Sequence, residues 1–357
     1  MNFRRFLIGV LDRTLPGREQ EAREDMARSR RLCRVAVGLL TVALVLLATH
    51  ILWSLIVDRS PAPVLPPARE AIQGTVPFRF AVVGDNRGNM EVFEEILARI
   101  KEEHVSLILH TGDLVDHSGE RQFTWLLHEL GEEKLPVPLC AVPGNHDIDE
   151  AAKDPSTRCR LYGRAFGQRR YWFAYANALF VALDDSTERV SPDDLQWLDR
   201  TLAQFRSQYT LCFVYMHVPP RDPRPGRTHA LEEGAENLIG IMTKHRVNAV
   251  FAGHIHSYLE DNVAGIPVYI TGGAGAELEE PSDRYHYLVC TVAPDGSFSL
   301  QKRDVDYLRN TDYPEYAFRV KFPSNIALFV SASLLFSSGL LFGLGSFPTR
   351  SRKTDLT

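Results

Sequence analysis

The sequence predicts an α/β fold for the middle of the chain, and two patterns carry this prediction. Short apolar runs rich in Val, Ile, Leu and Phe are bounded by Gly or Pro, which is typical of strands buried on both faces. Stretches with helical spacing of apolar residues follow the first two runs. With 357 residues, 45% hydrophobic and 24% charged, the chain can hold one sizeable domain with appendages.

Five apolar runs are expected to form the central strands. They span residues 78–83, 106–111, 139–142, 211–216 and 249–252. Residues 90–103 and 119–131 follow the first two runs, and in both stretches Val, Phe, Ile and Leu recur at helical spacing. We therefore expect a strand, loop and helix rhythm at the start of the domain.

The remaining elements are expected around and after these strands. Residues 171–175 and 178–183 predict a hairpin that turns at Ala176 and Asn177. Residues 192–206 predict a helix, because Ser191 can cap it and Pro192 suits its first position. We expect three more strands to complete the sheet, at residues 266–271, 287–292 and 297–304.

Each of the five central runs ends in polar residues. In chain order these ends are Gly84-Asp85, Gly112-Asp113, Pro143-Gly144-Asn145-His146-Asp147, His217 and Gly253-His254-Ile255-His256. In open α/β sheets, ligands bind beyond the carboxyl ends of the strands. We expect the glycines to let the backbone turn in conformations that a residue with a Cβ resists.

The polar residues at these strand ends are of types that bind divalent metal ions. Asp113 has a carboxylate that can bridge two cations, and Asn145 offers a carbonyl oxygen. Neutral imidazole nitrogens come from His217, His254 and His256, and the mixture suits Mn, Fe or Zn. Two such ions about 3.5 to 4 Å apart can activate a bridging water for in-line phosphoryl displacement. The sequence therefore predicts a hydrolase with two divalent metal ions.

Taken in order, the segments GD, GDLVD, GNHD, H and GHIH resemble those of the calcineurin-like metallophosphoesterases, from about Phe78 to about Asp304. The resemblance implies a four-layer α/β/β/α sandwich with a dinuclear metal site. It implies the following ligands: Asp85 and His256 for one metal, Asn145, His217 and His254 for the other, and Asp113 as the bridge.

The resemblance also implies roles for residues that do not bind metal. His146 is similar to the family histidine that gives a proton or hydrogen bond to the leaving group or the phosphoryl oxygen, and Asp147 would then orient it. Asp116 is either a partner of the site or a residue that starts a helix, and the sequence leaves both open. We expect His110, inside an apolar run, to be a hydrogen-bonded core histidine.

One position departs from the family pattern. Many members have Asp-x-His in the first motif, whereas this chain has Asp85-Asn86-Arg87. Arginine stays protonated and cannot ligate a metal, so water fills the place or the first ion binds more weakly. We hypothesise that Arg87 instead faces the substrate phosphate and holds it through two hydrogen bonds.

Both ends of the chain contain apolar segments. Residues 35–57 have no charged side chain apart from His50 when protonated, and are long enough to cross a bilayer as a helix. Residues 326–347 are also free of charge, and we expect a second span there rather than a buried helix of the domain. Gly339 and Gly343 form a G-x-x-x-G that can bring helices together, so helix–helix self-association is open.

Basic residues at the two ends indicate the topology. Nine arginines precede the first span, and Arg350, Arg352 and Lys353 follow the second, so the positive-inside rule places both termini in the cytoplasm and the catalytic domain on the periplasmic or extracellular side. A cleaved signal peptide would have a shorter apolar core and a briefer charged leader. The expected segments are a basic cytoplasmic stretch at 1–34, a transmembrane helix at 35–57, a Pro-rich linker at 58–76, the phosphoesterase domain at 77–307, a linker at 308–325, a second transmembrane helix at 326–347 and a basic tail at 348–357.

The sequence therefore predicts a membrane-anchored phosphoesterase that cleaves a phosphate ester or phosphoanhydride by attack of a metal-bridging hydroxide. Lipid-linked, nucleotide and protein phosphates all remain open as substrates. The net charge of −5 and the pI near 6.2 argue against nucleic acid as a bulk electrostatic partner. The alternative is a catalytically silent, metal-binding membrane scaffold, which need not retain His146 together with a complete second-metal set.

Overall fold

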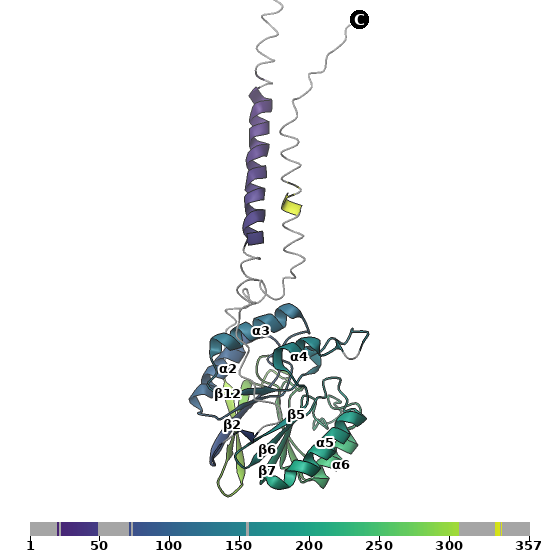
Figure 1. Cartoon of the computed structure of the whole chain (residues 1–357). Coiled ribbons are helices and arrows are strands. Elements are labelled where there is room, and N and C mark those ends of the chain that lie inside the picture. The colour runs from purple at the N-terminus through teal and green to yellow at the C-terminus, as the bar shows by residue number, and fades with distance from the viewer. Residues whose placement is uncertain are drawn as a thin grey trace, which may run out of the picture. The chain divides into compact units, whose positions relative to one another are not determined.

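The strands that the structure describes lie in one of the two units of the protein. The computed structural model describes residues 20, 23–48, 71–72, 74–154, 157–306, 333–335 and 337 (Figure 1). One unit consists of Met1–Ile56 with Ala317–Thr357, and the other of Val57–Tyr316. The second unit holds the twelve strands of the described residues, arranged in two sheets.

The smaller sheet has five strands in the order β12-β11-β2-β3-β4. Their bounds are β2 (Phe78–Val83), β3 (Ile108–His110), β4 (Leu139–Ala141), β11 (Tyr285–Val292) and β12 (Phe298–Val305). The strands β2, β3 and β4 are parallel, and Val83, His110 and Ala141 lie side by side in register. The carboxyl ends of three strands therefore meet at one edge of this sheet.

The larger sheet has seven strands in the order β1-β5-β6-β7-β8-β10-β9. Their bounds are β1 (Ala71–Ile72), β5 (Tyr171–Tyr175), β6 (Ala178–Ala182), β7 (Leu211–Tyr215), β8 (Ala249–Ala252), β9 (Tyr258–Val263) and β10 (Ile266–Thr271). The parallel strands β6, β7 and β8 are also in register, since Ala182 pairs with Tyr215 and Tyr215 with Phe251. This sheet thus brings a second set of strand ends to one edge.

The two sheets pack face to face through an aromatic core. The ring of Phe80 in β2 lies 5.2 Å from that of Phe180, 5.4 Å from that of Phe213 and 5.7 Å from that of Phe251, measured between centroids. The last three rings belong to β6, β7 and β8 of the larger sheet. Burial of four large aromatic side chains between the sheets fixes their relative position, because close-packed rings leave little room for sliding.

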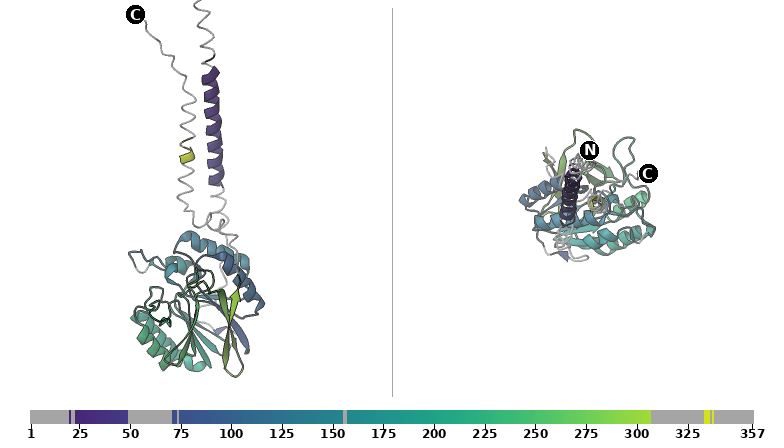
Figure 2. Two further views of the ribbon diagram at one scale, coloured as in Figure 1. Left: turned by 180° about the vertical axis from the view of Figure 1, so that it is seen from behind. Right: turned by 90° about the horizontal axis from the view of Figure 1, so that it is seen from above.

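Helices cover the outer faces of the sheets (Figures 1 and 2). The helix α2 (Met90–Glu102) packs on the smaller sheet, where Phe93 meets His110 of β3 edge to face, and α3 (Glu120–Glu133) lies beside α2. On the larger sheet, α5 (Pro192–Phe205) and α6 (Ala235–Lys244) share a second buried core with β7 and β8. A short helix, α4 (Arg160–Phe166), and the 3-10 turns η1 (Asn145–Asp147) and η3 (Arg206–Gln208) complete the described elements of this unit.

Most of the expected elements are present at nearly the expected bounds. The Ser191 hydroxyl accepts a hydrogen bond from the backbone N–H of Asp194 at 3.2 Å and caps α5 as expected. The β5–β6 hairpin turns at Ala176, whose φ is +50°. The strand β9 was not expected, because its sequence YLEDNV is polar. Among the described strands it lies at the edge of the sheet and pairs with β10. An edge strand is open to solvent on one side, so it tolerates polar side chains.

The other unit contains an apolar helix at Arg23–Ala48. This helix of 26 residues is long and apolar enough to cross a membrane. A signal sequence near an N-terminus has the same properties. The helix begins at Arg23 rather than at residue 35, so basic residues extend the expected apolar segment. Residues 49–57 of the first expected span lie outside the described residues, as do most of the second expected span at 326–347 and the tail at 348–357.

The carboxylate of Glu103 links α2 to strands of the smaller sheet. It accepts a hydrogen bond from Arg303 Nε of β12 at 2.7 Å and forms an ion pair with Arg79 of β2. Its side chain is 16% exposed, so these pairs are poorly screened by water. Burial alone would raise the pKa of Glu103, but the hydrogen bonds from Arg303 and Arg79 outweigh it, and the pKa lies below its usual value of 4.5.

Replacing this carboxylate should therefore destabilise the domain in a pH-dependent way. We expect Glu103→Gln to lower the free energy of unfolding at pH 7 by about 1 to 2 kcal/mol. The stabilisation is fully present above the unfolded-state pKa and is lost as pH falls through the lower folded-state pKa, so the difference between the two proteins should be smaller at pH 3 than at pH 7. Urea unfolding at both pH values measures this.

The exposed pair of Glu95 with Arg99 provides the control. We expect Glu95→Gln to change the free energy of unfolding by less than about 0.5 kcal/mol at either pH. A Glu103→Gln deficit of equal size at pH 3 and pH 7 would contradict the assigned role of the charge.

Candidate metal centre

The six candidate ligands follow the carboxyl ends of strands in both sheets. Those that follow β2, β3, β4, β7 and β8 are, in chain order, Asp85, Asp113, Asn145, His217, and the pair His254 and His256. Because the strand ends are in register within each sheet and the sheets pack face to face, these residues converge on one place. The five loops therefore form a single cluster.

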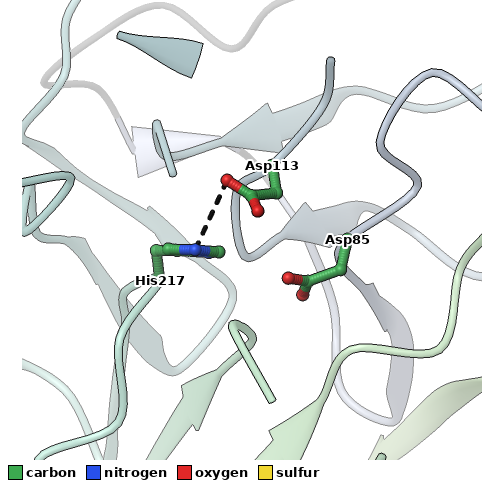
Figure 3. Close-up of side chains that lie close together, drawn as sticks. All are labelled: Asp85, Asp113 and His217. Atoms are coloured by element: carbon green, nitrogen blue, oxygen red, sulfur yellow. Dashed lines mark ion pairs between the residues drawn. The ribbon is translucent and has the colours of Figure 1, made fainter. Parts of the chain in front are cut away.

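Three buried side chains form the centre of this cluster (Figure 3). One ligand atom from each of Asp85, Asp113 and His217 lies within 4.8 Å of the others. His217 Nε2 is 3.4 Å from Asp113 Oδ1, and the two carboxylates point toward the same space. All three residues are at most 1% exposed, so bulk water cannot balance the charge of the carboxylates.

The ring of His217 directs a lone pair at this space. Its Nδ1 lies 2.9 Å from the carbonyl oxygen of Thr111 and donates to it, so Nε2 is the unprotonated nitrogen of the neutral ring. Nε2 lies 3.0 Å from Asn145 Oδ1 and 3.3 Å from His254 Nδ1. The carboxylate of Asp113, the amide oxygen of Asn145 and this nitrogen are all acceptors, and a cation would satisfy them together.

A second acceptor pair lies on the other side of Asp85. His256 Nδ1 donates to the carbonyl oxygen of Glu277 at 2.8 Å, so its Nε2 holds a lone pair 3.7 Å from Asp85 Oδ1. The Asp85 carboxylate also accepts from the backbone N–H of His254, at 3.0 and 3.1 Å. The six candidate ligands are thus joined by contacts into one cluster with two acceptor groups.

The protonation states of the cluster fit a cation site. Burial lowers the pKa of His254 to about 3 and also lowers the pKa values of His217 and His256, so the imidazoles are neutral at pH 7, the form that binds metal. Burial and the nearby Asp113 raise the pKa of Asp85 well above its usual value. Arg87 lies close enough to both carboxylates to offset part of their charge, and divalent cations would balance the rest.

We expected the glycines before the candidate ligands to adopt unusual backbone conformations. In the structure, three of the candidate ligands themselves have a left-handed backbone. Asp85, Asp113 and His254 have φ values of +61°, +57° and +67°. Of the glycines that precede the motifs, Gly112 has a positive φ, of +99°, but Gly253 does not. A Cβ on Gly253 would lie 2.8 Å from Thr111 Oγ1 and closer still to Asp85 Oδ2. Space near the ligands, more than backbone freedom, therefore requires glycine there.

The role expected for Asp147 differs in the structure. Its carboxylate accepts from the backbone N–H groups of Gly144 at 2.8 Å, Val115 at 3.1 Å and Leu114 at 3.2 Å, and so ties two ligand loops together. Burial and the nearby Asp113 raise the pKa of Asp147 to about 8. The expected contact from Asp147 to the ring of His146 is absent from the described contacts, because three amides already occupy the carboxylate.

The ring of His146 is held by Asp116 and Arg87 instead. His146 Nδ1 lies 2.7 Å from the carbonyl oxygen of Asp116 and 2.8 Å from a terminal nitrogen of Arg87. That same nitrogen of Arg87 is 3.4 Å from the Asp116 carboxylate. Asp116 is thus a partner of the site, which settles the choice that the sequence left open. Arg87 Nε is buried and has no hydrogen-bond partner among the described residues.

Two further residues complete the surroundings of the cluster. His110 is a core histidine as expected: its Nε2 lies 3.1 Å from Asn86 Oδ1, and burial, with the nearby His217, lowers its pKa to about 3. Asp185 was not expected, yet its carboxylate accepts from the backbone N–H groups of His217 at 2.9 Å and Val218 at 2.7 Å. A sequence signal for it exists, because Asp185 follows the apolar run at 178–183 as the other acidic residues follow theirs.

The sequence is similar to known phosphoesterases. The calcineurin-like phosphoesterase family model matches residues 78–258, a range that contains all six candidate ligands. A probable cyclic nucleotide phosphodiesterase of Fibrobacter succinogenes is 23% identical over 183 residues, covering 49% of this chain and 67% of the relative. A probable glycerophosphodiester phosphodiesterase of Arcobacter nitrofigilis is 28% identical, and the match covers 42% of this chain and 56% of the relative. Purple acid phosphatase 22 of Arabidopsis thaliana is 26% identical, and the match covers 57% of this chain and 52% of the relative. The chain thus spans between about half and two thirds of these curated relatives.

Solved structures share the fold. A purple acid phosphatase from yellow lupin seeds superposes with a TM-score of 0.53 at 18% identity, covering 64% of this chain and 52% of that chain. A dimetal phosphatase from Danio rerio superposes with a TM-score of 0.51 at 17% identity, covering 64% and 96%. The mixed α/β fold expected from the sequence is therefore confirmed.

The close packing around Gly253 gives a prediction for the metal centre. We expect Gly253→Ala to lower the affinity for Mn²⁺ about tenfold or more, because the added methyl group displaces the Asp85 carboxylate. Isothermal titration of Mn²⁺ into the purified protein measures this.

The control is Gly240→Ala in α6, where an added Cβ has no atom within 4 Å. It should leave Mn²⁺ affinity unchanged and stabilise the helix by about 0.5 to 1 kcal/mol. Equal Mn²⁺ affinities for wild type and Gly253→Ala would contradict the placement of the ion beside Asp85.

Proposed function

Because the chain belongs to the calcineurin-like phosphoesterase family, we propose that it is a membrane-anchored, metal-dependent hydrolase of a phosphate ester or phosphoanhydride. The observation that carries this proposal is the buried cluster of Asp85, Asp113 and His217, in which acceptor atoms face one another. The substrate is a phosphorylated lipid, nucleotide or protein.

The donor set supports two metal positions. We assign the ligands as follows: Asp85 and His256 to one ion, Asn145, His217 and His254 to the other, and Asp113 to both. Carboxylate, amide and imidazole donors together suit Mn, Fe or Zn. When bound, two such ions would activate a water and neutralise the phosphoryl oxygens. The protein supplies the neutral imidazoles, the fixed carboxylates and the exclusion of bulk water.

His146 is suited to assist the leaving group. Its Nδ1 is anchored at the carbonyl oxygen of Asp116, which leaves Nε2 free to exchange a proton or a hydrogen bond with the departing oxygen. Asp147 acts one step further away, since it holds the loop of His146 against the loop of Asp113 through backbone amides.

Arg87 stands where many family members have a metal-binding histidine, and we propose that it contacts the phosphoryl group. Its buried Nε has no hydrogen-bond partner among the described residues, so the Nε–H of the guanidinium group is available to donate to a substrate oxygen.

The membrane arrangement that we propose follows the apolar segments. The helix Arg23–Ala48 anchors the chain in the lipid bilayer, and residues 326–347 form a second span. Arginines before the first and basic residues after the second hold both termini in the cytoplasm, so the domain works on the periplasmic or extracellular side. The G-x-x-x-G of Gly339 and Gly343 offers a surface for helix–helix self-association.

Hydrolysis of model substrates by the detergent-solubilised chain tests the proposed activity. We expect Mn²⁺-loaded protein to cleave bis(p-nitrophenyl) phosphate or p-nitrophenyl phosphate, and EDTA to abolish cleavage reversibly. His217→Ala should lower kcat/KM by about 100-fold or more, because a fully buried candidate ligand is lost.

His104→Ala is the matched control, since that exposed histidine follows the end of α2 that is remote from the site. It should leave kcat/KM unchanged. Metal binding without cleavage of either ester would instead indicate a silent scaffold, and cleavage that survives both EDTA and His217→Ala would refute the metal mechanism.

The role of Arg87 has its own test. We expect Arg87→Ala to lower kcat/KM about 10- to 100-fold at unchanged metal content, and Arg87→Lys to recover part of the loss, because lysine keeps the charge but not the fork. Steady-state kinetics with metal analysis measures both. Arg99→Ala, which removes the exposed partner of Glu95, is the control. Unchanged KM and kcat in Arg87→Ala would exclude contact with the substrate.

Reporter fusions test the proposed topology. Alkaline phosphatase fused after Val57 should be active, because it lies outside the cytoplasm, and the same reporter fused after Phe347 should be inactive. The same result at both positions would contradict the two-span arrangement, and release of the domain by cleavage near residue 48 would indicate a signal sequence.

A further inference from the structure

A polar cavity outside the metal cluster is formed by two loops near His146 and the start of α4. It has a volume of about 330 Å³. Its lining consists of Ser118, Asp149, Thr157, Arg158, Arg160 and Leu161. None of these residues has a role in the metal site or in the chemistry proposed above.

The chain holds this cavity within a short distance of His146 and of its partner Asp116. Ser118 lies two residues beyond Asp116, whose carbonyl oxygen contacts the ring of His146. Asp149 lies three residues beyond His146. Since an extended chain spans at most about 3.6 Å per residue, the Cα of Ser118 is within about 7 Å of Asp116 and that of Asp149 within about 11 Å of His146. The backbone N–H of Asp149 donates to the carbonyl oxygen of Arg158 at 2.9 Å and fixes the far wall.

The lining has donors that the protein itself does not use. Ser118 Oγ and Arg158 Nε are both buried, and neither has a hydrogen-bond partner in the part of the chain that the structure describes. Buried donors without acceptors are rare in folded proteins, and each costs free energy. A bound acceptor would remove that cost.

The charge of the lining favours an anion. Neither Arg158 nor Arg160 forms an ion pair with a carboxylate of the described residues, whereas Arg164, further along α4, pairs with Glu120 at 2.8 Å. Asp149 is the one acidic side chain in the lining, so the two guanidinium groups outnumber it. Thr157 is already engaged, because its hydroxyl donates to the carbonyl oxygen of Asp154.

We propose that this cavity is a subsite for an anionic group carried by the leaving portion of the substrate. A carboxylate or phosphate there would accept from Arg158, Arg160 and Ser118, and guanidinium groups bind such planar or multi-oxygen anions through paired hydrogen bonds. This inference rests on the proposed function and narrows it. The substrate is then a phosphate ester or anhydride whose leaving group bears a second negative charge.

Two chromogenic diesters that differ only in the leaving group test the subsite. The pair is phenyl 4-nitrophenyl phosphate and phenyl 3-carboxy-4-nitrophenyl phosphate, assayed with the Mn²⁺-loaded full chain in detergent. We expect kcat/KM to be about tenfold higher for the carboxylate-bearing diester, as one charge-assisted contact permits. Arg158→Ala and Arg160→Ala should each reduce this ratio, and the double variant should bring it to about one.

The ratio of the two kcat/KM values distinguishes a loss of anion binding from a folding defect, because a folding defect lowers kcat/KM for both diesters by the same factor. Arg158→Lys keeps the charge and should retain part of the preference, and Arg164→Ala, outside the cavity, should retain all of it. A wild-type ratio of about one with both diesters cleaved would overturn the subsite and leave the phosphoesterase intact. A preference that survives the double variant would also overturn it. Cleavage of neither diester by a protein that still cleaves p-nitrophenyl phosphate would overturn the subsite alone, and cleavage of none of the three esters would overturn the proposed function with it.

Discussion

The central constraint on this domain is the burial of two carboxylates, Asp85 and Asp113, beside one another. Arg87 offsets part of this charge, but the neighbouring imidazoles are neutral near pH 7, so divalent cations would balance the rest. The layered fold follows from the same need. Parallel strands in register bring their ends together within each sheet, and the aromatic core between the sheets brings the two sets of ends together. The fold thus serves to concentrate acceptors at a place that water does not reach.

Two other buried aspartates hold the loops that carry the ligands. Asp147 collects backbone amides from the loops after β3 and β4, and Asp185 collects those that follow β7. Burial raises the pKa of each, which reflects what the charged form loses on leaving water. Hydrogen bonds from amides offset part of that loss and fix each loop at two or three points. The positions of Asp113, Asn145 and His217 therefore depend on carboxylates that need touch neither metal nor substrate.

Local patterns were sufficient for the elements that are buried or capped. The sequence predicted the strands β2, β7 and β8 and the Ser191 cap of α5. Buried strands require apolar residues and helix caps favour particular polar residues, so both are recognisable in the sequence. The candidate ligands were predicted for the same reason, since each follows a strand. The edge strand β9 was missed because its open side tolerates polar residues. The expected contact of Asp147 with His146 is not among the described contacts, because Asp147 accepts from backbone amides and His146 lies at a backbone carbonyl, and backbone groups carry no sequence signal.

Arg87 shows how one substitution in a motif can change the geometry of a site. The guanidinium lies beside His146 and the Asp116 carboxylate, so the first motif contacts residues of the loops after β3 and β4. The most direct test of the account is anomalous diffraction from crystals of the domain grown with Mn²⁺. The account predicts two ions that share Asp113, one contacting His217 Nε2 and the other His256 Nε2. A single ion, or ions bound away from His217, would contradict it.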